Sequence, residues 1–267
     1  MIELAPRAAA ILFGVVSAHE RPWLLPANVC DIVPQTLRAA GRMFELVDID
    51  PATLEPSREQ IIDRARDCAG VVFVRTYGAI YDAEAFFASL KLLRDDFVIV
   101  DDRCLCRPDV DGELVSQDAT VTLFSTGYAK YVDLGGGGFA HAATAGRVTP
   151  EAAWREYRAQ VLAELARVDA IKEHLNAIYR AIIPEEVQLP AELCSWRFNI
   201  RVARAEELLR AITDAGLFAS RHYAPLEGGF PHATRLHEEI VNLFNDRYFN
   251  EEKATRTAEI VRHHVMR

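Results

Sequence analysis

The sequence predicts an α/β fold in which a mainly parallel sheet lies between helices, followed by a smaller C-terminal α+β domain. Short apolar runs alternate with amphipathic stretches over the first two-thirds of the 267 residues. Two of these runs, Gly70–Val74 and Phe97–Val100, are continuously apolar, as strands buried on both faces of a sheet must be. A stretch rich in Ala, Arg and Glu from Pro150 to Ile183 then predicts a long helix that joins the two parts.

The large domain is expected over residues 1–150. Its strands are expected at Trp23–Ala27, Met43–Ile49, Gly70–Arg75, Phe97–Val100, Ala119–Phe124 and Gly137–Ala142. Its helices are expected at Ala8–Ala18, Cys30–Ala40, Ser57–Cys68 and Ala83–Leu93. Gly41 is the residue type that ends a helix, and Ser57 with Gln60 three residues later has the spacing of a capping box. No helix is expected between the last two strands.

Residues 151–189 are expected to form a connecting helical segment, and residues 190–267 a small α+β domain. In the small domain a strand is expected at Trp196–Val202, an extended segment at Phe218–Tyr223, and helices at Ala205–Ala215 and Glu251–Val265. In a parallel sheet of this kind ligands bind beyond the carboxyl ends of the strands. That rule selects four places for a site, namely Pro26–Cys30, Arg75–Gly78, Asp101–Arg103 and Ser125–Lys130.

The composition excludes several classes of partner and location. The net charge of −9 argues against a nucleic-acid or membrane-surface protein, because either needs a basic face. The apolar runs are too short to span a membrane, and no signal peptide is recognisable, so a cytoplasmic protein is expected. Five cysteines include one C-x-C pair, Cys104 and Cys106, without the further ligands that zinc needs. We therefore expect free thiols and no metal.

One lysine stands apart from the others. Only four of the 30 basic residues are lysines, and Lys91, Lys172 and Lys253 fall on predicted amphipathic helices, where lysine is usually a solvated surface residue. Lys130 lies instead in a loop, five residues after Ser125 and shortly before four glycines. A lysine amine becomes a nucleophile when burial or a nearby cation lowers its pKa, whereas arginine stays protonated. The alternative is a surface lysine beside a flexible turn.

Two further features lie in the predicted ligand zone. Asp101 and Asp102 follow a buried strand, where a carboxylate could hold the protonated nitrogen of a cofactor ring. The alternative is a solvated strand end or a helix cap. The run Gly135–Gly138 fits neither nucleotide-binding glycine pattern, and it favours close backbone approach at a ligand or subunit contact.

In this order the segments resemble the fold-type I pyridoxal 5'-phosphate (PLP) enzymes, and within them the DegT/DnrJ/EryC1/StrS sugar aminotransferases. The segments that carry the resemblance are Leu25–Cys30, Gly41–Leu54, Val71–Gly78, Phe97–Cys104, Phe124–Gly137, Trp196–Phe198 and Ser220–Leu226. No single motif is specific, but the ordered set covers nearly the whole chain from Pro6 onward. The resemblance implies a PLP cofactor, a small-molecule substrate and a homodimer.

The resemblance also implies roles for individual residues. Lys130 would form the Schiff base with PLP, and Ser125 would bind the phosphate. Asp101 is placed on the ring nitrogen, although the choice between Asp101 and Asp102 stays open. Cys30 occupies the position of an aromatic ring that stacks on the cofactor in the family.

The same comparison indicates departures from the family and candidate substrate contacts. The phosphate-binding loop is reduced to Ala5–Ala8, where Pro6 weakens the start of the helix and Arg7 could supply part of the lost donors. Cys104 replaces the family's His or Gln three residues after Asp101. Candidates for binding substrate are Arg75, Tyr77, Arg197 and His222, and the alternative for the last two is a solvent-facing position in the small domain.

Two functions therefore remain. The first is a PLP-dependent transferase, an aminotransferase acting on a small polar or sugar-like substrate through Lys130. The second is a degenerate, non-catalytic protein that keeps the fold as a binding or dimerisation scaffold, which the reduced loop and Cys30 favour. Since a fold does not fix a function, the site must decide between them.

Overall fold

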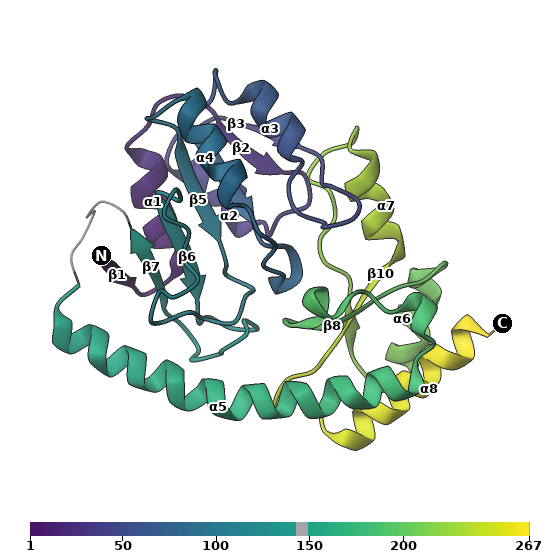
Figure 1. Cartoon of the computed structure of the whole chain (residues 1–267). Coiled ribbons are helices and arrows are strands. Elements are labelled where there is room, and N and C mark those ends of the chain that lie inside the picture. Colours follow the sequence, from purple (N-terminus) through teal and green to yellow (C-terminus); the bar gives the residue numbers. More distant parts are fainter. Residues whose placement is uncertain (143–148, 267) are drawn as a thin grey trace.

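The computed structural model describes residues 1–142 and 149–266. It contains a seven-stranded sheet in the order β1-β7-β6-β5-β4-β2-β3 and a three-stranded sheet in the order β8-β10-β9 (Figure 1). The strands of the large sheet are β1 (Ile2–Ala5), β2 (Trp23–Pro26), β3 (Phe44–Val47), β4 (Gly70–Val74), β5 (Val98–Asp102), β6 (Val121–Ser125) and β7 (Gly138–Ala142). Those of the small sheet are β8 (Phe198–Arg201), β9 (Ala219–Ser220) and β10 (Ile240–Leu243). The predicted α/β class with a second, smaller sheet is confirmed.

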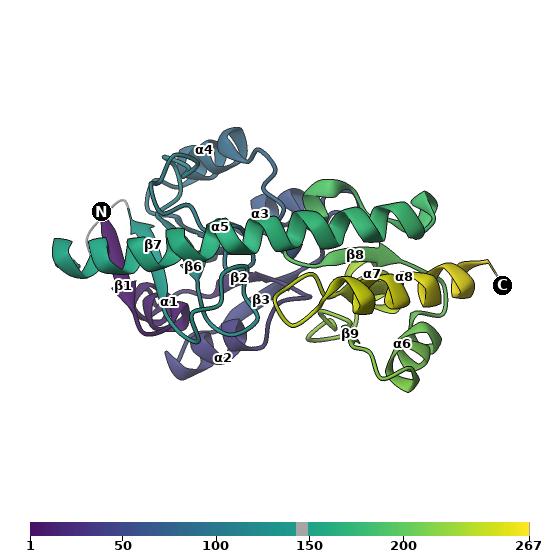
Figure 2. The same ribbon diagram turned by 90° about the horizontal axis from the view of Figure 1, so that it is seen from below.

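Helices cover both faces of the large sheet. The α-helices are α1 (Ala8–Ser17), α2 (Ile32–Ala39), α3 (Arg58–Arg64), α4 (Glu84–Leu93), α5 (Glu151–Ile182), α6 (Ala205–Asp214), α7 (Pro231–Glu239) and α8 (Glu251–Val265). Figure 2 shows α3 and α4 on one side of this sheet and α1 and α2 on the other. Short 3-10 turns lie at Thr76–Gly78, Glu185–Val187 and Ala191–Cys194.

Strands β2 to β6 pair in parallel, whereas β7 runs antiparallel to both β6 and β1. Because β6 and β7 are antiparallel neighbours, they need no crossover helix between them, as predicted. All residues of β4, β5 and β6 are buried. Their apolar runs therefore reflect packing on both faces.

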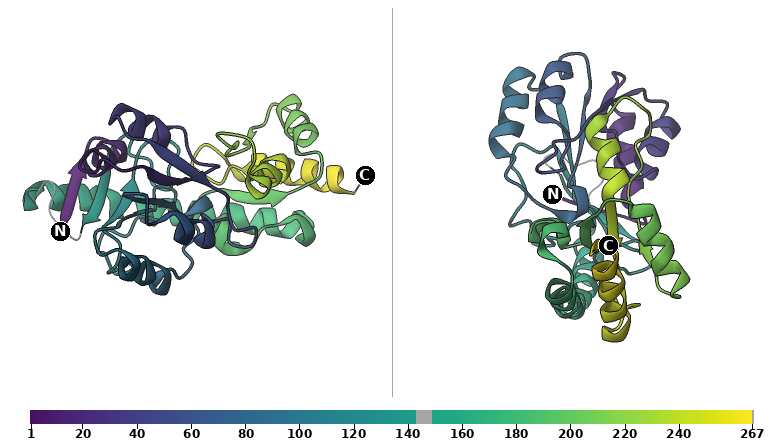
Figure 3. Two further views of the ribbon diagram at one scale, coloured as in Figure 1. Left: turned by 90° about the horizontal axis from the view of Figure 1, so that it is seen from above. Right: turned by 90° about the vertical axis from the view of Figure 1, so that its right-hand side faces the viewer.

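Helix α5 links the two sheets. Most of its buried side chains recur every three or four residues and form one stripe, with Val161, Leu165, Val168, Lys172, Leu175 and Tyr179, and Asn176 is buried beside it. The first three of the stripe pack with Phe124 and Phe139 of the large sheet, and its last two pack with β8 and β10 of the small one. Figure 3 shows the N-terminus and the C-terminus at opposite ends of the molecule. Residues 143–148, part of the predicted domain 1–150, lie outside the described residues.

Several local predictions need correction. Ser57 caps α3 by accepting a hydrogen bond from the Gln60 N–H at 3.4 Å. The Gln60 side chain, however, accepts from the N–H of Asp48 at 2.9 Å rather than completing a capping box, and α3 ends at Arg64 instead of Cys68. Lys172 is also not a surface lysine, since only 4% of it is exposed.

Three elements have no counterpart among the predictions, namely β1, α7 and β10. The most important is β10, which is the central, fully buried strand of the small sheet. It follows α7 directly, with no turn residue between Glu239 and Ile240. Among the described residues no helix has both the length and the apolar character that crossing a membrane requires.

Candidate active site

A cavity in the described part of the chain lies at the carboxyl ends of the parallel strands. Its volume is about 280 Å³, just below the range of about 300–1,000 Å³ typical of small-molecule sites. All four places selected from the sequence contribute to its wall, through Cys30, Arg75, Asp102, Ser125 and Lys130. Helix α1 and the glycine run close another side.

The two aspartates at the end of β5 point to opposite faces of the sheet. Successive side chains of a strand alternate in direction. Val98 and Val100 pack on the side of α1 and α2, so Asp102 lies on that side and lines the cavity. Ile99 packs with the core under α3 and α4, and Asp101 points the same way. The alternation therefore selects Asp102 for the cavity and corrects the assignment of Asp101 to the ring nitrogen.

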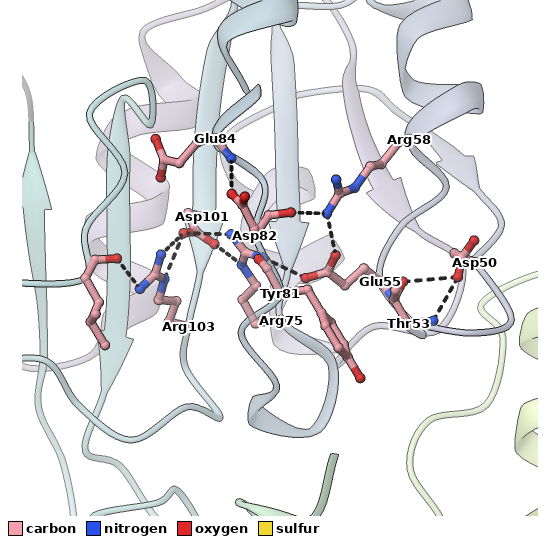
Figure 4. Close-up of polar contacts among 11 residues, drawn as sticks. Asp50, Thr53, Glu55, Arg58, Arg75, Tyr81, Asp82, Glu84, Asp101 and Arg103 are labelled. Carbon is pink, nitrogen blue, oxygen red and sulfur yellow. Dashed lines mark hydrogen bonds and ion pairs between the residues drawn. The ribbon is translucent and has the colours of Figure 1, made fainter. Parts of the chain in front are cut away.

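Asp101 belongs instead to a buried ionic cluster (Figure 4). Its carboxylate accepts from Arg75 Nε at 2.6 Å and from Arg103 Nε at 2.8 Å. Arg75 also donates to Glu55 at 2.7 Å and to the carbonyl oxygen of Tyr81 at 2.7 Å. Arg75 reaches the cavity wall, but all three of its guanidinium nitrogens donate within this cluster. Its predicted role in binding substrate is therefore corrected to a structural one.

Asp102 is a buried acceptor that faces a cation. Its Oδ1 accepts from the N–H of Cys104 at 3.0 Å. Burial raises the pKa of Asp102, while hydrogen bonds from Cys104 and the positive charge of Lys130 act in the opposite direction. The cavity thus brings together Lys130 and the second of the two candidate aspartates.

Lys130 is half-buried and lines the cavity. Within residues 1–142 and 149–266 its ammonium group has no hydrogen bond or ion pair. The preceding residue, Ala129, has a φ of 59°, a conformation that side chains other than glycine rarely adopt. The amine of Lys130 therefore projects from an irregular loop, where it can contact a ligand in the cavity.

A second end of the cavity suits an anion. The first turn of α1 contributes Ala8 and Ala9, and Arg7 and Ser125 lie beside it. The N–H groups and the dipole at a helix start favour negative charge. Pro6 precedes the cap residue Arg7, so it removes no N–H from the first turn, and the expected weakening of this helix start is corrected.

The glycine run explains how α1 comes so close to the sheet. A Cβ at Gly138 would overlap the backbone nitrogen and Cα of Ala8. At Gly137, with a φ of 94°, a Cβ would lie 2.7 Å from Thr126 Oγ1. The close approach that the structure shows lies between β7 and the start of α1 within this chain, rather than at the predicted ligand or subunit contact.

Both cysteines assigned to the cofactor line the cavity, but the register of one segment shifts. Counted from Asp102, the third residue is Leu105, which also lines the cavity. Cys104 therefore does not occupy the predicted position. It bonds to the Asp102 carboxylate through its N–H and its thiol instead.

The cavity wall includes three polar residues that are not among the candidates from the sequence, Thr36, Tyr128 and Tyr223. Tyr223 is the one from the C-terminal part of the chain. It belongs to the segment between β9 and α7, which reaches the large sheet where the N–H of Leu226 donates to the carbonyl of Ala27 at 2.8 Å. Burial raises the pKa of Tyr223, and the neighbouring Cys30 acts in the same direction. Tyr223 lies in the Ser220–Leu226 stretch that carries the family resemblance, where the sequence indicates the neighbouring His222 as the candidate.

Three candidate substrate contacts do not line the cavity. Tyr77 is fully buried and donates to the carbonyl oxygen of His222. Arg197 pairs with Asp246 at 2.7 Å and lies over the Phe244 ring. The His222 ring packs on Trp196, and burial lowers its pKa, with the charges of Arg197 and Lys130 adding to the effect. Tyr77 and His222 connect the two parts of the chain, whereas Arg197 pairs within the C-terminal part, so the structure places none of the three in the cavity and Arg197 is not solvent-facing.

Solved structures share this fold. A protein of Bacillus cereus described as a PLP-dependent aminotransferase matches with a TM-score of 0.80 and 12% identity, over 97% of this chain and 85% of its own. The sugar aminotransferase CalS13 of Micromonospora echinospora matches at 0.73 and 17%, over 98% and 87%. A DegT DnrJ EryC1 StrS aminotransferase of Brucella abortus matches at 0.72 and 16%, over 100% and 86%.

No family model and no curated protein matches the sequence. The chain therefore has the fold of PLP-dependent aminotransferases, fold type I, as predicted. At this level of identity the activity must be argued from the site.

Proposed function

We propose that this chain binds PLP and transfers an amino group to or from a small polar or sugar-like substrate. The observation that carries the proposal is the pairing of Lys130 and Asp102 in one cavity whose other end suits an anion. The amine of Lys130, the carboxylate of Asp102 and the anion-binding end match the aldehyde, the ring nitrogen and the phosphate of this cofactor, in that order. When bound, PLP supplies an electron sink for bonds to the substrate's amino-bearing carbon.

The chain's own groups then divide the work. The Lys130 amine would hold the cofactor covalently and, once a substrate amine had displaced it from that bond, would move a proton at the reacting carbon, as a nucleophile and then a general base. Asp102 accepts the ring N–H and keeps that nitrogen protonated, and Cys104 holds the carboxylate in place. Arg7, Ser125 and the start of α1 hold the phosphate. Sugar-like substrates are proposed because CalS13 is described as a sugar aminotransferase.

The test begins with cofactor attachment. PLP added to the purified protein should give the near-visible absorbance of a lysine-bound cofactor, and borohydride reduction should leave the cofactor mass on the peptide that carries Lys130. Lys130→Ala should lose both signals and all turnover with glutamate as amino donor. The control Lys253→Ala changes an exposed lysine of α8 and should lose neither.

A colourless wild-type protein in saturating PLP would contradict the proposal and favour the non-catalytic scaffold. Turnover of the amino donor that persisted in Lys130→Ala would instead contradict the role proposed for Lys130.

We also propose a homodimer in a reducing, cytoplasmic location. Two residues at the cavity, Tyr128 and Ile32, are 77% and 43% exposed, and a second copy would cover such apolar surface. All five cysteines are unpaired, as expected in a reducing compartment. Light scattering of the purified protein tests the dimer, and a monomer at micromolar concentration would contradict it.

A further inference from the structure

A side chain from the small-domain side, that of Trp196, bonds to the loop that carries Lys130. Trp196, just before β8, is 3% exposed, and its Nε1–H donates to the carbonyl oxygen of Ala129 at 2.8 Å. That oxygen belongs to the peptide unit between Ala129 and Lys130. The N–H of the same unit donates to the Gly127 carbonyl at 3.2 Å. Both polar groups of the peptide that precedes the lysine side chain are therefore bonded, and its plane is fixed.

The indole is itself immobile. Its ring lies parallel to that of Tyr77, with 6.5 Å between centroids and 7° between planes. The backbone N–H of Trp196 donates to the carbonyl oxygen of Tyr77 at 3.3 Å, and the backbone carbonyl oxygen of Trp196 accepts from Lys172 Nζ at 2.7 Å. Trp196 thus bonds to the 3-10 turn after β4, to α5 and to the lysine loop at once.

The position it holds is a strained one. Ala129 adopts a φ of 59°, in the left-handed region that a residue with a Cβ rarely occupies. Such a conformation persists only where the surroundings determine it. The residue after Lys130, Tyr131, is also anchored, because its hydroxyl donates to Asp169 of α5 at 2.8 Å.

We propose that Trp196 is a positioning residue, whose indole N–H fixes the Ala129–Lys130 peptide and so aims the Lys130 amine into the cavity. This inference rests on the proposed function for its consequence in catalysis. Its structural part concerns only the chain itself, because it predicts that the loop loosens when that one donor is removed.

The test replaces the donor and keeps a ring. Trp196→Phe removes the bond to Ala129. The matched control is Trp23→Phe, since Trp23 is fully buried and its Nε1 has no hydrogen-bond partner among residues 1–142 and 149–266. If Trp196→Phe does not fold, incorporating benzothienylalanine at position 196 keeps the shape of indole and removes only the N–H.

The first readout is amide hydrogen exchange of residues 126–137 in cofactor-free protein. Loss of one buried hydrogen bond should speed exchange there by about 5- to 30-fold relative to Trp23→Phe. The second readout is the rate of covalent PLP attachment to Lys130, which should fall in Trp196→Phe, together with a shift in the pH midpoint of the bound cofactor's absorbance.

Unchanged exchange in residues 126–137 overturns the proposal, as does faster exchange with unaltered attachment. If wild-type protein attaches no PLP, the proposed function fails separately, and the exchange comparison alone then decides whether Trp196 holds the loop.

Discussion

The two adjacent aspartates of β5 should respond in opposite ways to the same substitution. In Asp101→Asn an amide replaces a carboxylate that accepts from Arg75 at 2.6 Å and from Arg103 at 2.8 Å. The new NH₂ group can only face other donors, and two buried guanidinium groups lose their shared counter-charge. Asp102→Asn removes a buried charge whose hydrogen bonds come from Cys104.

The magnitudes follow from burial. Arg75 and Arg103 are each 2% exposed and Asp101 is fully buried, so breaking this cluster should cost about 3–5 kcal/mol of unfolding free energy. At about 2–4 °C per kcal/mol, the melting temperature falls by roughly 6–20 °C. For Asp102 the sign is reversed. Burial raises its pKa, so the folded state binds the proton more tightly, and stability falls as pH rises through the window above the unfolded value. Asp102→Asn abolishes that loss.

Urea and thermal unfolding at pH 7, followed by circular dichroism, measure both variants, and PLP titration measures the site. We expect Asp101→Asn to be strongly destabilised, and Asp102→Asn to be at least as stable as wild type but unable to sustain transamination. The reasoning is refuted if Asp101→Asn retains wild-type stability while losing cofactor chemistry, since Asp101 would then face the cofactor.

Two further predictions concern the helix junction and the glycine run. Burial, aided by the charge of Arg197, lowers the pKa of Lys172 to about 7. Between pH 7 and about 10 the unfolded chain therefore binds more protons, and wild-type stability should rise with pH. Lys172→Met should lack this rise in urea unfolding at pH 7 and pH 10, and equal pH dependence of the two proteins would exclude it. Gly138→Ala should displace the start of α1, costing about 1–3 kcal/mol and weakening PLP binding. The control Gly136→Ala meets only the Pro6 carbonyl at 3.7 Å and should stay within about 0.5 kcal/mol of wild type. Similar losses in calorimetry and PLP titration would contradict the role given to Gly138.

Most strands and helices of the large domain could be predicted because their signals are local. An apolar run or an amphipathic stretch identifies each element without knowledge of its neighbours. The central strand β10 could not be found in this way. Its four residues follow α7 without a turn, and their strand state depends on pairing with β8, in which Ile240 lies opposite Arg201.

The choice between Asp101 and Asp102 illustrates a second limit. A strand that is polar on one face reveals the direction of each side chain through its alternation. Strand β5 is buried on both faces, so no alternation shows which aspartate shares a face with Lys130. Which aspartate shares that face is defined only by the folded sheet, in which Phe73 of β4 lies opposite Asp101 and Val74 lies opposite Asp102.

Buried arginines set the third limit. Arg75 and Arg197 resemble substrate-binding residues in the sequence, because an arginine near a strand end is usually exposed. Their partners, Glu55 and Asp246, lie 20 and 49 positions away. Nothing local indicates that these guanidinium groups are already neutralised.

The long helix α5 packs against both parts of the molecule. Its buried residues up to Val168 pack in the core beside the large sheet, and those from Leu175 onward pack in the core of the small sheet. One residue inserted between them would rotate everything beyond it by about 100° and advance it by about 1.5 Å. The number of residues between Val168 and Leu175 is therefore set by the two cores, so insertions at the ends of α5 should be tolerated far better than insertions in its middle.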